Sequence, residues 1–296
     1  MSVDVDSILA TATATATAIA TGPIGDAVAS GELPGRVWLY SNYHCNLACS
    51  YCLTESSPRS ARRELEPGLM LAVARQAREL GFTALGVTGG EPTLLPWLAE
   101  TVAEMADELP VVLLTNATLF GGDRIERMRA LARPDVAVQI SLDSHIADVN
   151  DMARGPANFD KVVDAVPRLL ALGVCVRIAT TTDGPLDDPA LEPLRELVAS
   201  LGVASNDHLI RPIVRRGRAD GNDLGVVAAA RDIPCELTIT ADGAFWGSFG
   251  PTVRGGRLDT DLLLTRTVLP LSIPANALLG AVRGLPPGTD AQLGIR

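Results

Sequence analysis

Three cysteines stand close together in the segment NYHCNLACSYCL, which covers residues 42–53. Cys45, Cys49 and Cys52 make up three of only five cysteines in the chain, and the other two are isolated. Thiolates bind soft metal centres such as zinc ions and iron–sulfur clusters. The spacing of these residues therefore predicts a metal site.

Three interpretations fit this spacing. A helical segment would place the three sulfurs on one face, where they could belong to a small buried apolar stripe. A structural zinc ion could take the three thiolates together with His44, although such sites usually draw their ligands from two separated places in the chain. A [4Fe–4S] cluster held by only three thiolates would leave its fourth iron open for a substrate to coordinate.

The rest of the chain must supply a scaffold for this segment, and its pattern alternates between strands and helices. Strands are predicted at residues 36–42, 83–87, 110–116, 135–143, 174–181 and 207–214, and helices at residues 66–80, 95–109, 123–132, 159–173 and 190–202. This alternation predicts an α/β fold with a parallel sheet. Six such units form a partial (β/α)6 TIM-like barrel, with reactive groups at the C-terminal ends of its strands.

Polar motifs follow the first four strands: the cysteine segment, TGGEPT (88–93), TNAT (115–118) and SLDS (141–144). The Cys-x3-Cys-x2-Cys pattern with Tyr51 before its last cysteine, followed by Gly89-Gly90-Glu91-Pro92, resembles the radical S-adenosylmethionine (SAM) superfamily. This resemblance covers about residues 36–215.

The resemblance implies two cofactors, a [4Fe–4S] cluster and SAM. In that family, the amine and carboxylate of SAM chelate the open iron, and one electron cleaves the sulfonium. The resulting 5′-deoxyadenosyl radical abstracts a hydrogen atom from the substrate. An electron donor such as flavodoxin or ferredoxin is therefore an expected partner.

The resemblance also implies roles for individual residues. The GGEP turn would accept hydrogen bonds from the SAM ammonium group, although a tight βα turn with proline at a helix start is the alternative. In one subgroup, the residue matching Ser141 contacts the ribose and the residue matching Arg154 pairs with the carboxylate, whereas a surface ion pair is the alternative for Arg154. Asn116 is expected to line the cleft. The expected cofactor-binding set is Tyr51, Gly89, Gly90, Glu91, Pro92, Asn116, Ser141 and Arg154; the expected metal-binding set is Cys45, Cys49 and Cys52; no catalytic residue is assigned.

Three regions are expected: a low-complexity mobile leader (1–34), the radical SAM core (35–215) and a C-terminal extension (216–296). The extension resembles the Twitch and SPASM domains that hold auxiliary clusters in many relatives. Cys235 precedes a predicted hairpin with Asp242-Gly243 at its turn, but no second cysteine follows it. We therefore expect no auxiliary cluster, and the hairpin is expected to act as a lid.

Composition limits the partners. The net charge of −10 argues against nucleic acid, which requires concentrated basic residues. The uncharged run at residues 7–25 has an acidic flank and is rich in Thr and Ala, so neither an export signal nor a membrane span is expected. The expected location is the cytoplasm, where disulfides are rare.

The expected activity is that of a radical SAM enzyme acting on a small biosynthetic intermediate, such as a sugar, an aminocyclitol or a nucleoside-like molecule. The N-terminal run offers no domain that could grip a leader peptide, which favours a small molecule. The alternative substrate is a ribosomal peptide, and the alternative of another class is a zinc-stabilised binding protein. Four arginines could form a cationic patch near the barrel mouth: Arg211, Arg215, Arg216 and Arg218.

Overall fold

Six parallel strands form the centre of the protein. The computed structural model describes residues 22–228, 233–248, 250–254 and 257–284. Each strand pairs with the next along the chain, as predicted. The strands are β1 (Arg36–Tyr40), β2 (Ala84–Thr88), β3 (Val111–Thr115), β4 (Val136–Ser141), β5 (Cys175–Thr182) and β6 (His208–Pro212). Short apolar runs form such strands because a parallel sheet is covered on both faces.

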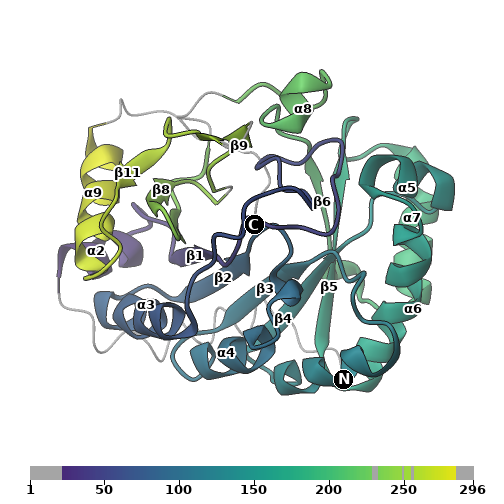
Figure 1. Ribbon diagram of the computed structural model, residues 1–296, viewed down its shortest axis with the longest axis horizontal. Helices are drawn as coiled ribbons and strands as arrows, with labels where there is room; N and C mark the ends of the chain where they lie inside the picture. The colour runs from purple at the N-terminus through teal and green to yellow at the C-terminus, as the bar shows by residue number, and fades with distance from the viewer. Residues whose placement is uncertain (1–21, 229–232, 249, 255–256, 285–296) are drawn as a thin grey trace.

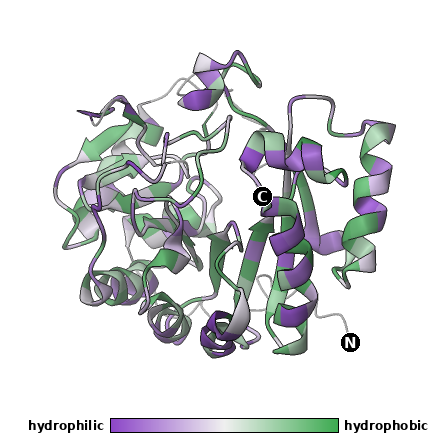
Figure 2. Ribbon diagram, turned by 45° about the vertical axis from the view of Figure 1, so that its right-hand side comes forward, coloured by the Kyte–Doolittle hydropathy of each residue, from purple (hydrophilic) through white to green (hydrophobic). Residues whose placement is uncertain are grey.

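Helices connect the strands and cover the outer face of the curved sheet (Figure 1). They are α3 (Pro67–Leu80), α4 (Leu98–Met105), α5 (Ala147–Arg154), α6 (Asn158–Ala171) and α7 (Glu192–Ser200). Their apolar sides face the sheet and their polar sides face outward (Figure 2). This arrangement confirms the predicted α/β class with a partial barrel.

One predicted helix has a different geometry. Residues Gly122–Leu131 form a 3-10 helix, η2. Its buried apolar side chains are Ile125, Met128 and Leu131, which lie three residues apart. A 3-10 helix has three residues per turn, so this spacing places all three on one face.

The C-terminal hairpin joins the sheet instead of covering the barrel mouth, so the expectation of a lid is wrong. Strand β7 (Leu237–Thr240) pairs in parallel with β1, β8 (Gly243–Trp246) pairs antiparallel with β7, and β11 (Leu263–Thr265) follows at the outer edge. The hairpin turn is Ala241–Asp242, because Thr240 pairs with Gly243. The sheet therefore has nine strands among the described residues, with β6 at its other edge.

Part of the expected leader is folded. The helix α2 (Pro23–Ala29) buries Ile24 and Ala27, and Leu33 is also buried. It lies beside α9 (Ser272–Arg283), which packs against β11 and β7 (Figure 1). The remainder of the expected leader, residues 1–21, lies outside the described residues. No helix in the described part of the chain is long and apolar enough to cross a membrane.

Candidate active site

The cysteine segment is a loop that starts where β1 ends. It contains turns but no helix, so the helical apolar stripe does not form. Cys45 is buried, whereas Cys49 and Cys52 are half-buried. All three line one cavity of about 240 Å³, whose other lining residues include the C-terminal ends of β2, β3, β4 and β6. The barrel geometry thus brings the cysteines together with the polar strand ends.

The C-terminal extension holds this loop in place. Gly217 has a positive φ of 59°, and a Cβ there would lie 2.2 Å from the Leu53 carbonyl oxygen, so the two backbones touch. Six loop carbonyls accept hydrogen bonds from residues 218–253. They are Cys49 O from Arg218 Nε (2.7 Å), Ser50 O from Asn222 Nδ2 (2.7 Å), Cys52 O from Arg218 N (3.0 Å), Leu53 O from Thr252 Oγ1 (2.9 Å), Thr54 O from Val253 N (3.0 Å) and Ser56 O from Arg218 Nη2 (2.5 Å).

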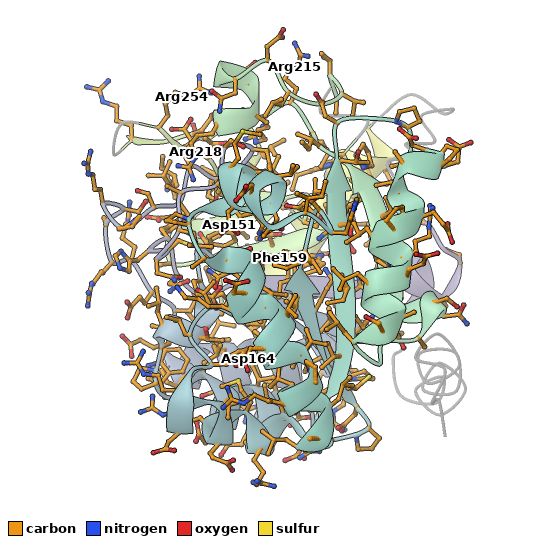
Figure 3. All side chains as sticks on the ribbon, turned by 90° about the vertical axis from the view of Figure 1, so that its right-hand side faces the viewer. Asp151, Phe159, Asp164, Arg215, Arg218 and Arg254 are labelled. Carbon is orange, nitrogen blue, oxygen red and sulfur yellow. The ribbon has the colours of Figure 1, made fainter. Side chains whose placement is uncertain are left out.

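Arg218 is the centre of this contact, which we call the loop clamp (residues 217–222 and 252–254). Figure 3 shows Arg215, Arg218 and Arg254 at the same end of the molecule, near the short helix α8 (Arg218–Gly221). Arg215 and Arg216 are paired with Asp223 and Asp261, so the expected cationic patch of four arginines does not form. Only Arg211 and Arg218 of that set line the cavity.

The two glycines of the GGEP turn pack against the beginning of the cysteine loop. A Cβ at Gly89 would lie 2.5 Å from Asn42 Oδ1, and one at Gly90 would lie 2.2 Å from the His44 carbonyl oxygen. The Gly90 and Glu91 amides donate to the carbonyls of Asn42 and His44, at 2.7 and 3.0 Å. Both glycines also line the cavity. The close backbone contact with the cysteine loop explains why these two positions have no side chain.

Glu91 is buried and joins the ends of two strands. Its Oε1 accepts hydrogen bonds from the Thr93 amide (3.0 Å), the Thr93 hydroxyl (2.5 Å) and the Thr115 hydroxyl (2.7 Å), and its Oε2 accepts one from the Asn116 amide (2.8 Å). Burial raises the pKa of Glu91, and these donors oppose the rise. Pro92 starts a 3-10 turn and does not line the cavity, as the turn alternative expects.

Asn116 connects β3 to the cysteine loop. Its Nδ2 donates to Asn46 Oδ1 (3.0 Å) and approaches Cys45 Sγ (3.9 Å), while its Oδ1 accepts from the Thr118 amide and hydroxyl. The Leu47 amide also donates to Cys45 Sγ, at 3.3 Å. N–H donors of this kind stabilise negative charge on a thiolate sulfur.

Arg154, Tyr51 and Asp143 form a buried cluster in the cavity wall. Arg154 Nη1 donates to Asp143 Oδ2 at 2.8 Å and also to the Tyr51 hydroxyl, which itself donates to Asp143. Arg154 therefore does form an ion pair, but the pair is buried and does not lie on the surface. Arg154 Nε is buried and has no hydrogen-bond partner. Ser141 lines the cavity from the end of β4.

The donor set suits an iron–sulfur cluster and SAM. Burial raises the pKa of Cys45 and of Cys49; the charge of Glu91 adds to the rise at Cys45, and that of Arg154 opposes it at Cys49. Binding iron therefore requires the thiols to lose their protons. Arg154 and Ser141 line the same cavity with polar side chains that a cosubstrate could use.

The zinc set with His44 is not assembled. His44 Nδ1 lies 3.3 Å from the Ser60 carbonyl oxygen, and His44 does not line the cavity. Among the described residues, no group of three or more His, Cys, Asp or Glu side chains surrounds one ion position.

Sequence reasoning missed two residues of the site. Asp143 holds Arg154 and Tyr51, and its position in SLDS, at the end of a predicted strand, was an available signal. Arg218 was assigned only to a cationic patch near the barrel mouth, because contacts with the cysteine loop 162 and 169 residues earlier leave no local pattern.

Comparisons with known proteins agree with this geometry. The model of the radical SAM superfamily matches residues 39–198, more than half of the chain. The mycofactocin maturase MftC of Mycobacterium tuberculosis is 35% identical over 132 residues, which cover 44% of this chain and 33% of MftC. A protein named "Probable GTP 3',8-cyclase" from Archaeoglobus fulgidus is 27% identical over 171 residues, covering 57% and 56% of the two chains.

Two solved structures show the same fold. Streptococcus suis SuiB bound to SAM has a TM-score of 0.51 at 19% identity, over 62% of this chain and 41% of SuiB. The protein anSMEcpe with bound AdoMet has a TM-score of 0.55 at 15% identity, over 73% and 72%. The chain spans about a third of the length of the maturases it matches. The three cysteines, the GGEP turn and the family match lead to one conclusion: this chain belongs to the radical SAM superfamily, whose enzymes use a [4Fe–4S] cluster and SAM.

Proposed function

We propose that this radical SAM enzyme modifies a peptide. The main support for radical chemistry is that Cys45, Cys49 and Cys52 line the same cavity as Arg154 and the GGE residues of the GGEP turn. A cluster held by these cysteines would supply the electron that cleaves SAM to a hydrogen-abstracting 5′-deoxyadenosyl radical. An external donor such as flavodoxin or ferredoxin would supply that electron in turn.

The chain's own residues prepare the cavity for these groups. The Leu47 amide and the Asn116 side chain hydrogen-bond the Cys45 sulfur and favour its deprotonated state. Arg154 lines the cavity and its guanidinium, fixed by Asp143, would pair with a SAM carboxylate. Ser141 offers a hydroxyl to the ribose, and Oε2 of Glu91, with one donor, can accept a further hydrogen bond.

Two observations support a peptide substrate over a small biosynthetic intermediate. MftC is a maturase, and SuiB has been solved bound to its precursor peptide SuiA. In addition, Ile146, which precedes α5, and Val149 and Met152 within it are exposed at three-residue spacing, with exposures of 49%, 45% and 81%. None of the three lines the cavity, but this helix also carries Arg154, which does, and exposed apolar patches often mark surfaces that contact another chain.

A small nucleoside-like substrate is the second candidate. The similarity to GTP 3',8-cyclase favours it, and that similarity covers more of this chain than the similarity to MftC does.

The radical chemistry is tested by anaerobic reconstitution with iron and sulfide, followed by SAM and dithionite. We expect 5′-deoxyadenosine from the wild type and none from Cys45→Ala. The matched control is Cys235→Ala, which removes a half-buried thiol outside the cavity and should keep both iron and activity. Equal 5′-deoxyadenosine from Cys45→Ala and the wild type would disprove the assignment.

The substrate class is tested by the rate of 5′-deoxyadenosine formation. We expect synthetic peptides, with sequences taken from short reading frames beside the gene, to increase this rate and to change in mass. GTP should leave the rate of 5′-deoxyadenosine formation unchanged. Stimulation by GTP alone would favour the second candidate.

A further inference from the structure

Three arginines line the cavity, and one of them has no acceptor. Arg154 is paired with Asp143, and Arg218 donates to the carbonyls of Cys49 and Ser56. Arg211, in the edge strand β6, forms no hydrogen bond or ion pair with the described residues. It is half-buried and faces the same cavity as the cysteines.

This position is unfavourable for a guanidinium in the free protein. Burial lowers the pKa of Arg211, the Coulombic interactions with Tyr51 and Asp143 oppose this shift, and the charges of Arg154 and Arg177 add to it. A partly buried cation without a partner loses part of its hydration free energy, and no contact within the protein restores it. An anion that entered the cavity beside Arg211 would offset this loss.

The protein's own carboxylates are already engaged. Asp143, which exerts an attraction on Arg211, accepts from the Thr181 amide at 2.9 Å through Oδ1 and from Arg154 and Tyr51 through Oδ2. Glu91, the carboxylate in the cavity lining, accepts four hydrogen bonds from the ends of β2 and β3. Neither is positioned to neutralise Arg211 by direct contact.

We propose that Arg211 binds a carboxylate of the substrate and so fixes the substrate's position in the cavity. This inference rests on the proposed peptide substrate, whose fixed anions are its C-terminus and its Asp and Glu side chains. A guanidinium grips a carboxylate with two parallel hydrogen bonds, which restricts orientation as well as distance. Fixing the substrate in this way would select which hydrogen atom lies within reach of the radical.

The first test measures the labelling of Arg211 by phenylglyoxal, quantified by mass spectrometry, on the cluster-loaded chain with SAM under anaerobic conditions. N-acetylglycine represents a C-terminal carboxylate, N-acetylglutamic acid α-amide a side-chain carboxylate, and N-acetylglycinamide the neutral control. At a probe concentration of twice its Kd, mass action predicts roughly threefold slower labelling. The exposed Arg129 should be labelled at an unchanged rate.

The pattern of protection decides the proposal. Protection by either carboxylate without protection by the amide supports it and identifies the source of the carboxylate. Equal protection by the amide, or none by any probe, overturns it. Complete protection by SAM alone, with no further response to the carboxylates, also overturns it by assigning Arg211 to the cosubstrate.

Two variants separate binding from folding. Arg211→Gln should bind neither carboxylate probe in an anaerobic calorimetric titration, yet unfold at a temperature no lower than that of the wild type, because an uncompensated cation is removed. Arg211→Lys keeps the positive charge but loses the planar guanidinium that binds a carboxylate through two hydrogen bonds, so it should bind the probes more weakly than the wild type. A fall of several degrees for Arg211→Gln would show that Arg211 instead stabilises the fold, and would overturn the proposal.

Failure of this proposal and failure of the proposed function give different results. If the enzyme made no 5′-deoxyadenosine while Arg211 still bound carboxylates, the proposed reaction would fail and the anion site would stand. If 5′-deoxyadenosine formed normally but no carboxylate protected Arg211, the anion site would fail and the proposed radical reaction would stand.

Discussion

Replacing Arg218 with Gln should loosen the cysteine loop by an amount that the structure allows us to estimate. The side chain donates to the carbonyls of Cys49 (2.7 Å) and Ser56 (2.5 Å). Hydrogen bonds from a charged donor contribute about 1.5–3 kcal/mol each. Because Arg218 is half-buried, water replaces part of this interaction, so we expect a loss of about 2–3 kcal/mol in the free energy of unfolding.

With an unfolding entropy of about 2.1 cal/mol/K per residue, a loss of this size lowers the melting temperature by about 3–5 °C in a chain of 296 residues. The matched control is Arg129→Gln, which removes an exposed pair with Glu126 and should cost about 0.3–0.5 kcal/mol. Both variants would be examined by calorimetry and by iron analysis after anaerobic reconstitution. We expect Arg218→Gln alone to lose iron, because its contacts fix the backbone between the cysteines.

The same melting temperature and iron content in the two variants would refute this reasoning. That result would mean that the other clamp contacts, from Asn222, Thr252 and Val253, are sufficient to hold the loop.

The remaining predictions concern the turn, the carboxylate beneath it and a histidine. Gly90→Ala should prevent iron loading, because its Cβ would lie 2.2 Å from a backbone carbonyl oxygen, whereas Gly68→Ala in open space should load normally. Glu91→Gln should lower the free energy of unfolding by about 1–3 kcal/mol in urea titrations, because its amide NH2 cannot accept from the Asn116 amide. Burial lowers the pKa of His208 from 6.5 to about 4. Between these two pH values the histidine is protonated in the unfolded protein but neutral in the folded one, so the free energy of unfolding falls as the pH drops from 6.5 to 4. His208→Asn should remove this part of the pH dependence, and an unchanged slope in thermal melts would contradict it.

Local patterns were enough to predict the core of the fold. The strands are short apolar runs such as VVLLT (111–115), and the helices have one apolar side, so both periodicities are visible in the sequence. The site location followed from the same alternation, because parallel strands bring their C-terminal ends together.

Contacts between distant segments could not be predicted. Nothing near Leu237 indicates that it pairs with Val37, which lies 200 residues earlier. The engagement of Glu91 by four donors depends on where the end of β3 lies in space. The 3-10 geometry of residues 122–131 was readable in principle, since apolar residues three apart favour it.

The pairing of β7 with β1 has a consequence for how the protein is made. Strand β1 emerges from the ribosome early, but its partner and the loop clamp emerge about 200 residues later. Until residue 218 is released, the nascent cysteine loop lacks all six carbonyl contacts with residues 218–253, and the set is complete only after residue 253 is released. Because domains complete their packing only when distant segments meet, iron insertion should follow the release of residue 253 rather than the release of the cysteine loop.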